Sequence, residues 1–210
     1  MQKVVFQKLF VLPVGVFLFI GGCGRKPAEL SEVLSKDGSF IPGPGFAWGD
    51  SKEQVLEKLP HRECLTPGNK AFEAFRNTES GEGYSTLFAV DTLTFQGIDK
   101  PFKVLYEFER DTGLYCVHYD LEVSHLEAGL QVLRQLLPLL YELYPESSMG
   151  DSSYLRRFET EAFSEEGVNF IDWQGEDGTV LRLMTFLLEY GETDGRKCYI
   201  SLQTGMPTDQ

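Results

Sequence analysis

The residues from Phe102 to Leu121 alternate between apolar and polar side chains, and this alternation constrains the fold more than any other feature of the sequence. One apolar parity runs through Phe102, Val104, Tyr106 and Phe108, and after residues 110–113 it resumes with Tyr115, Val117, Tyr119 and Leu121. A period of two residues is typical of a strand with one buried face. Two such runs joined by a short turn predict an antiparallel hairpin with one apolar face.

A helical period follows the hairpin. Apolar residues recur every three or four positions at Leu126, Leu130, Leu133, Leu137, Leu140 and Tyr144, with Leu136 and Leu143 widening the stripe. This spacing predicts a long amphipathic helix. Pro138 lies inside it, so either the helix kinks or two shorter helices meet there. A shorter helix is predicted over Lys52–Leu59, because either Ser51 with Gln54 or Asp50 with Glu53 has the spacing of a capping box.

Further strands are predicted over residues 84–95, 169–173, 180–190 and 197–204, where β-branched and aromatic residues are frequent. Together these elements predict an α+β fold. An antiparallel sheet packs against one long and one short helix.

The two halves of the chain show a similarity to each other. Phe95-Gln96-Gly97-Ile98-Asp99 matches Trp173-Gln174-Gly175-Glu176-Asp177 in pattern. When the two halves are aligned on this match, the short helix corresponds to part of the long helix, and the first hairpin corresponds to the last strands. The match indicates a tandem duplication of helix plus small sheet, with halves 46–122 and 123–206. Shared turn chemistry without duplication explains the same three identities, and both interpretations stay open.

The composition limits the partners of the chain. The 210 residues include 19 Lys and Arg against 32 Asp and Glu, a net charge of −13. A surface of this sign repels nucleic-acid phosphates and anionic lipid headgroups, so we expect no nucleic-acid partner. No glycine-rich loop joins a predicted strand to a predicted helix in residues 23–210, so the sequence predicts no nucleotide cofactor, and we expect none of any other kind.

The N-terminus has the pattern of an export signal. Lys3 and Lys8 precede and interrupt an apolar run that is too short for a permanent membrane span. The run ends in Ile20-Gly21-Gly22-Cys23, which resembles the lipobox of bacterial lipoproteins. The resemblance implies cleavage after residue 22, acyl chains such as palmitate on Cys23, and attachment to the extracytoplasmic side of a membrane of the bacterial cell envelope. The lipid bilayer is then a partner through Cys23.

The residues after the lipobox are divided into a tether and a domain. Residues 1–22 form the predicted signal peptide. Residues 23–45 contain several glycines and prolines and are predicted to be a flexible tether, so the globular domain covers residues 46–210. At its start, Phe46-Ala47-Trp48-Gly49-Asp50-Ser51 resembles, over about ten residues, an entry found in outer-membrane assembly lipoproteins and β-lactamase inhibitor proteins.

The candidate chemistry lies on the second hairpin strand. Cys116, His118 and Asp120 share the polar parity, and His125 follows at the start of the long helix. A thiol and an imidazole are typical of nucleophilic catalysis or of metal binding. However, side chains at i and i+2 stand about 7 Å apart along a strand, which is too far for a hydrogen bond without a bend. The sequence therefore predicts no catalytic or metal site, with Cys116, His118 and His125 as the candidates if a neighbouring strand completes one.

Strand parity also places the thiols. Cys198 shares the apolar parity of Ile200 and Leu202 and is predicted to be a buried free thiol, whereas Cys116 faces the other way. A disulfide needs Cβ atoms about 4 Å apart, so these two cannot pair. The remaining bridge is Cys64–Cys116, while a chain with all three cysteines reduced is the alternative.

Two functional classes agree with these observations. The first is a non-enzymatic envelope lipoprotein that binds a protein, peptide or cell-wall component through its sheet or helix surface. The second is a surface-tethered, thiol-dependent or metal-assisted hydrolase that uses Cys116, His118 and His125. The lack of a complete catalytic constellation in the sequence favours the first.

Overall fold

The fold was analysed in a computed structural model, which describes residues 26–59, 86–109, 112–145, 162–163, 169–189 and 196–206. The predicted signal peptide with Cys23, and also Cys64, lie outside these residues. The described residues form three helices, one large sheet and a small two-stranded sheet. The predicted α+β class is therefore confirmed.

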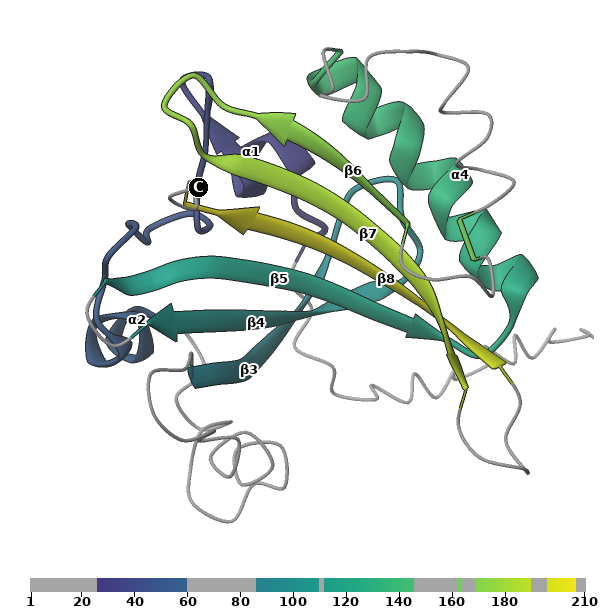
Figure 1. Ribbon diagram of the computed structural model, residues 1–210, viewed down its shortest axis with the longest axis horizontal. Coiled ribbons are helices and arrows are strands. Elements are labelled where there is room, and N and C mark those ends of the chain that lie inside the picture. The colour runs from purple at the N-terminus through teal and green to yellow at the C-terminus, as the bar shows by residue number, and fades with distance from the viewer. Residues whose placement is uncertain are drawn as a thin grey trace, which may run out of the picture.

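The large sheet has six strands and is antiparallel throughout (Figure 1). Its order is β3-β4-β5-β8-β7-β6. The bounds are β3 (Thr86–Thr94), β4 (Pro101–Glu109), β5 (Gly113–Val123), β6 (Asn169–Gln174), β7 (Val180–Glu189) and β8 (Arg196–Gly205). The predicted hairpin is β4 and β5, and the apolar side chains of β4, from Phe102 to Phe108, are buried as expected.

The strand order is symmetric about its centre. Strands β3, β4 and β5 form one meander, β6, β7 and β8 form another, and the last strands of the two meet as the β5–β8 pair. Phe95 directly follows β3, the first strand of one meander, and Trp173 lies near the end of β6, the first strand of the other. Both side chains are buried. This arrangement supports the interpretation of the two halves as copies of one helix-plus-sheet unit.

The long helix α4 (Leu126–Leu143) covers the core face of the sheet as one continuous helix, with Pro138 inside it. Its buried stripe consists of Gly129, Val132, Leu133, Leu136, Leu137 and Leu140. The prediction was wrong for Leu126 and Leu143, which are 51% and 39% exposed. Both lie at helix ends, beyond the part that contacts the sheet. Among the described residues, no helix has the length and hydropathy to cross a bilayer.

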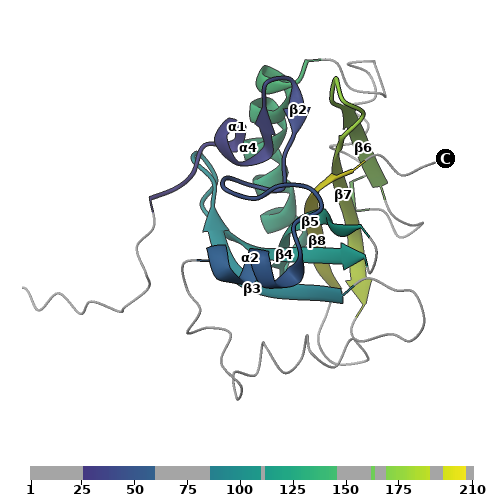
Figure 2. The same cartoon turned by 90° about the vertical axis from the view of Figure 1, so that its left-hand side faces the viewer.

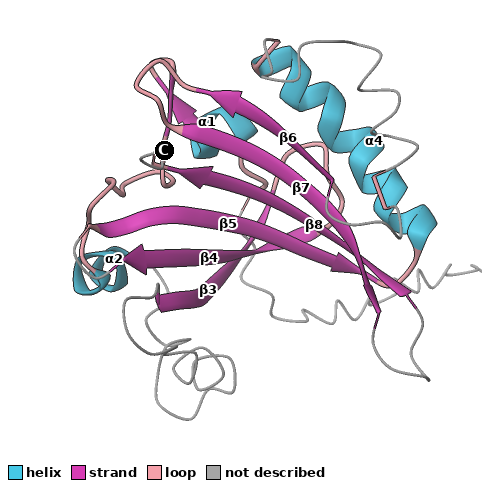
Figure 3. Ribbon diagram, viewed as in Figure 1, coloured by secondary structure: helices cyan, strands magenta, loops and turns pink. Residues whose placement is uncertain are grey.

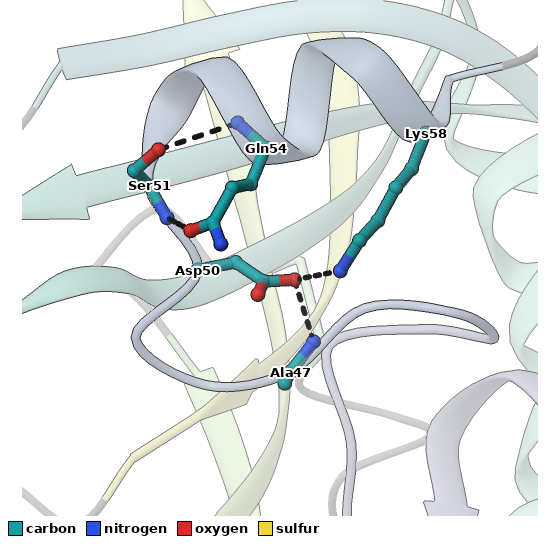
Figure 4. A network of polar contacts seen from close by, with 5 residues as sticks. All are labelled: Ala47, Asp50, Ser51, Gln54 and Lys58. Carbon is teal, nitrogen blue, oxygen red and sulfur yellow. Dashed lines mark hydrogen bonds and ion pairs between the residues drawn. The ribbon is translucent and has the colours of Figure 1, made fainter.

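The short helix α2 (Lys52–Lys58) begins with the predicted capping box (Figure 4). The Ser51 hydroxyl accepts from the Gln54 amide, and the Gln54 side chain accepts from the Ser51 amide. Asp50 accepts from the Ala47 amide at 2.9 Å and from Lys58 at 2.6 Å. These bonds fix the loop that leads into α2, and Val55 packs into the core.

Residues 28–45 pack against the domain, which corrects the predicted tether over residues 23–45 and the domain start at 46. Helix α1 (Leu30–Leu34) buries Leu30, Val33 and Leu34, and strands β1 (Ser35–Lys36) and β2 (Ser39–Phe40) form a hairpin that buries Phe40. The hairpin turns at Asp37-Gly38, both with positive φ, as tight hairpin turns require. Ala28 also joins the end of β3, where its N–H donates to the carbonyl of Thr94 and its carbonyl accepts from the N–H of Gln96.

The described helices lie on one face of the six-stranded sheet (Figures 2 and 3). Side chains of the core cluster from α1, α2 and α4 meet the same parity of every strand from β4 to β8. The opposite parity of the strands carries mostly polar side chains, and no helix of the described residues covers it. We call this side of the sheet the open face.

Candidate functional site

A continuous row of side chains crosses the open face. The ladder pairs Leu105 of β4 with His118 of β5, His118 with Gln203 of β8, Gln203 with Arg182 of β7, and Arg182 with Asp172 of β6. Paired residues of an antiparallel sheet point to the same side. The row therefore brings together residues far apart in the sequence, and it includes an imidazole, a guanidinium and a carboxylate.

At the end of this row that lies on β4 and β5, Glu107 forms a cluster with Cys116 and His118. The carboxylate Oε2 of Glu107 lies 2.8 Å from Nε2 of His118. The ladder places Glu107 directly opposite Cys116. One donor atom from each of the three residues lies within 4.8 Å of the others. A thiol, an imidazole and a carboxylate thus converge on one point of the open face.

A β-bulge at Tyr115 shapes this cluster. Glu107 pairs with Cys116 but Phe108 pairs with Leu114, so Tyr115 is an extra residue on β5. Leu114 is fully buried, while Tyr115 is only partly buried. The prediction that Tyr115 shares the core parity of Val117 and Tyr119 is therefore wrong. A bulge increases the local twist, and it lies next to the position where the Cys116 and His118 side chains approach each other.

The pKa of His118 reflects these neighbours. Burial alone would lower it, but hydrogen bonds with Cys116 and Glu107, together with the charges of Cys116 and Asp120, raise the pKa from 6.5 to about 10. His118 and Glu107 side chains are only 18% and 20% exposed. The imidazole is therefore a cation at neutral pH, and it is held between acidic neighbours with little contact with water.

Asp120 extends the polar surface beyond His118. Its carboxylate accepts from the Tyr199 hydroxyl and, at 2.6 Å, from the hydroxyl of the fully buried Ser201. Gln203 donates to the same Ser201 hydroxyl. Tyr199 stacks at a tilt on Phe186 with ring centroids 4.7 Å apart. These contacts fix the orientation of the side chains in the middle of the open face.

Arg182 and Asp172 form an ion pair with two hydrogen bonds on this surface. Nε and Nη2 of Arg182 donate to the two carboxylate oxygens of Asp172 at 2.7 and 2.8 Å. The guanidinium also lies 4.8 Å from the centre of the Phe170 ring. The hydrogen bond with Asp172 and the charges of Asp172 and Cys116 raise the pKa of Arg182 despite partial burial. Arg182 therefore stays charged and is held in a fixed position.

A pocket opens between Arg182 and Cys116. Its volume is about 170 Å³, and it is lined by Tyr115, Cys116, Val180, Arg182, Gln203, Gly205 and Met206. The Cys116 side chain is partly exposed and is a free thiol. The pocket thus gives small molecules or ions a route to the thiol from solvent.

The structure separates the predicted site residues into two groups. Cys116, His118 and Asp120 lie together on the open face, as parity predicted. His125 is exposed at the start of α4, beyond the end of β5. The residues between His118 and Val123 alone span about 17 Å of strand. A site that combines His125 with Cys116 and His118 is therefore not supported by the fold.

Glu107 is the site residue that sequence reasoning missed. In the sequence it is one of several charged residues of the polar parity of β4. Its pairing with Cys116 depends on the register of the hairpin, which the bulge at Tyr115 sets. Only a prediction of that register would have identified it.

Cys198 lies on the core face and is fully buried, as predicted. Burial raises the pKa of its thiol. Cys64 lies outside the described residues, but Cys116 is a free thiol, so the predicted Cys64–Cys116 bridge is not formed in this structure.

Comparison of the chain with protein-family models, with curated proteins and with solved structures gives no match.

Proposed function

We propose that this protein is a bacterial envelope lipoprotein, anchored through an acylated Cys23, that binds a protein, peptide or cell-wall component on the open face of its sheet. The lipobox pattern Ile20-Gly21-Gly22-Cys23 supports the anchor. The anchor would hold the domain on the extracytoplasmic side of a membrane. The proposed role is non-enzymatic.

The observation that carries the binding role is the open face itself. The row from Leu105 to Asp172 presents charges of both signs, and Phe170 beside it is 38% exposed. The hydrogen bonds of Arg182 and Asp120 hold these side chains before a partner arrives, which reduces the entropy cost of binding. A rigid surface with both aromatic and charged groups is typical of protein and peptide recognition.

A hydrolase is the second candidate, because Cys116, His118 and Glu107 converge beside a pocket. The arrangement resembles a nucleophile with a neighbouring imidazole. This candidate differs from the one expected from the sequence, since Glu107 takes the place of His125. It predicts that the Cys116→Ser variant loses turnover of an ester or peptide substrate, while the binding role predicts no turnover by either form.

Crosslinking in cells tests the binding role. A photoreactive amino acid replaces Phe170 on the open face or, as the matched control, Leu126, which is also apolar and exposed but lies on α4. We expect a discrete crosslinked product from position 170 only. The product should disappear when Arg182 is changed to Ala. Equal products from both positions would contradict the proposal. A product that also forms when Arg182 is changed to Ala would contradict it as well.

Metabolic labelling tests the anchor. The Cys23→Ser variant should incorporate no labelled fatty acid and should leave the membrane fraction or accumulate as the uncut precursor. The Cys64→Ser variant is the control and should be labelled like the wild type. Unchanged labelling of the Cys23→Ser variant would show that the lipobox interpretation is wrong.

A further inference from the structure

We propose that Glu107, Cys116 and His118 form a binding site for a zinc ion on the open face. The proposal does not depend on the binding role of that face, because it rests only on the three side chains and their surroundings. The site combines two neighbouring strands of the hairpin, and the bulge at Tyr115 lies at its edge.

The distances fit an ion after small side-chain rotations. A tetrahedral zinc ion holds its donor atoms about 3.3–3.8 Å apart, because bonds of about 2.0–2.3 Å meet at tetrahedral angles. The donor atoms here lie within 4.8 Å of one another, with Glu107 and His118 at 2.8 Å. The Glu107–His118 pair must therefore open slightly, and a donor pair longer than about 3.8 Å must close.

The donor set selects the class of metal. Calcium and magnesium take oxygen ligands, so a thiolate in the set disfavours both. One sulfur, one nitrogen and one oxygen donor are typical of zinc, which accepts all three types. Three protein ligands with one open position are typical of catalytic rather than structural zinc sites. The pocket that Cys116 lines brings solvent to the thiol side of the cluster.

The charges around the cluster favour a cation. Glu107 and Cys116 belong to the cluster, and Asp120 lies two residues beyond His118 on the same face. A zinc ion would supply positive charge at this point, next to Glu107, Cys116 and Asp120. Arg182 is the opposing charge, but its guanidinium is paired with both oxygens of Asp172. Leu105, beside His118 in the row, is 4% exposed, and the His118 and Glu107 side chains are 18% and 20% exposed, so burial restricts their motion.

Cobalt binding tests the site in the full chain, reduced and held in detergent. Cobalt replaces zinc in thiolate sites and gives a sulfur-to-metal charge-transfer band. We expect a saturable band that zinc abolishes and that is absent from the Cys116→Ser variant. Affinity should fall at least about tenfold in Glu107→Gln and His118→Gln. Three control variants should keep the band: His125→Ala, Cys64→Ser and Cys198→Ala.

A second measurement needs no variant. Zinc should slow alkylation of Cys116 in the wild-type chain, read by peptide mapping, while Cys64 and Cys198 react at unchanged rates. The proposal is overturned if Cys116 reacts equally with and without zinc, if no saturable band forms, or if the band survives in Cys116→Ser. Equal affinity of Glu107→Gln, His118→Gln and the wild type would overturn the three-ligand assignment as well.

Discussion

Gly129 of α4 lies directly against Cys198 of β8, so close that a Cβ added to the glycine would be 2.9 Å from the Cβ of the cysteine. The same added atom would be 2.9 Å from the ring of Phe163. The helix therefore approaches the sheet here at a distance that only glycine permits. This contact determines how deeply α4 packs onto the β5–β8 centre.

Gly129→Ala tests this close approach. Alanine favours a helix by up to about 1 kcal/mol over glycine, so an exposed site would be stabilised. Here we expect a net loss of about 1–3 kcal/mol in the free energy of unfolding, because the helix must move away from the sheet. Urea unfolding measures it. Gln131→Ala, at an exposed position of the same helix, should change stability by less than about 0.5 kcal/mol. A more stable Gly129→Ala would contradict the packing.

Truncation of the buried stripe tests the packing of α4. Leu133 and Leu137 are 1% and 2% exposed, so each change to Ala should cost about 2–5 kcal/mol. Leu126→Ala is the matched control, and at 51% exposure it should cost less than about 0.5 kcal/mol. Chemical denaturation gives all three values. A cost below about 1 kcal/mol at both buried positions would mean that the stripe faces solvent.

The ionisation of His118 predicts a pH dependence of stability in the metal-free protein. Its folded pKa of about 10 lies above the ordinary 6.5. The stabilisation from its charge is therefore complete below pH 6.5 and is lost as the pH rises towards about 10. We expect His118→Gln to reduce this loss of stability, as measured by unfolding across that range. An NMR titration of Glu107→Gln should show a lower pKa for His118. An unchanged pKa would argue against the ion pair.

The thiols should differ in reactivity. Cys198 is fully buried and its pKa is raised, so alkylation should reach it only on unfolding, whereas the partly exposed Cys116 should react in the native state. Cys198 pairs with Val123 in the ladder, about 23 Å along β5 from Cys116. No Cys116–Cys198 crosslink should appear in a non-reducing peptide map. Equal labelling rates in the native state would contradict the assignment of the two faces.

The regular elements were predictable because their signals are local. The alternation of Phe102 to Phe108 and the period of Leu133, Leu137 and Leu140 each report a buried face without reference to the rest of the chain. The same holds for Cys198, whose parity gave its burial correctly. The apolar helix ends at Leu126 and Leu143 were wrongly included, since periodicity does not show where the contact with the sheet stops.

The remaining features depend on long-range contacts. The burial of Leu30 and Leu34 requires the core on which they pack, and the glycines and prolines around them favoured a flexible segment. The spacing of Leu30, Val33 and Leu34 was the available signal for a packed helix. The candidate cluster depends on the register that pairs Glu107 with Cys116, and no local pattern predicts the bulge that sets it.

The hydrogen bonds of Ala28 with β3 have a consequence for a protein anchored at Cys23. Only five peptide units separate the two residues, and a fully extended chain of that length reaches about 17 Å. The domain would then be held against the headgroup region with restricted rotation, and the end of β3 at Thr94 would be near the bilayer.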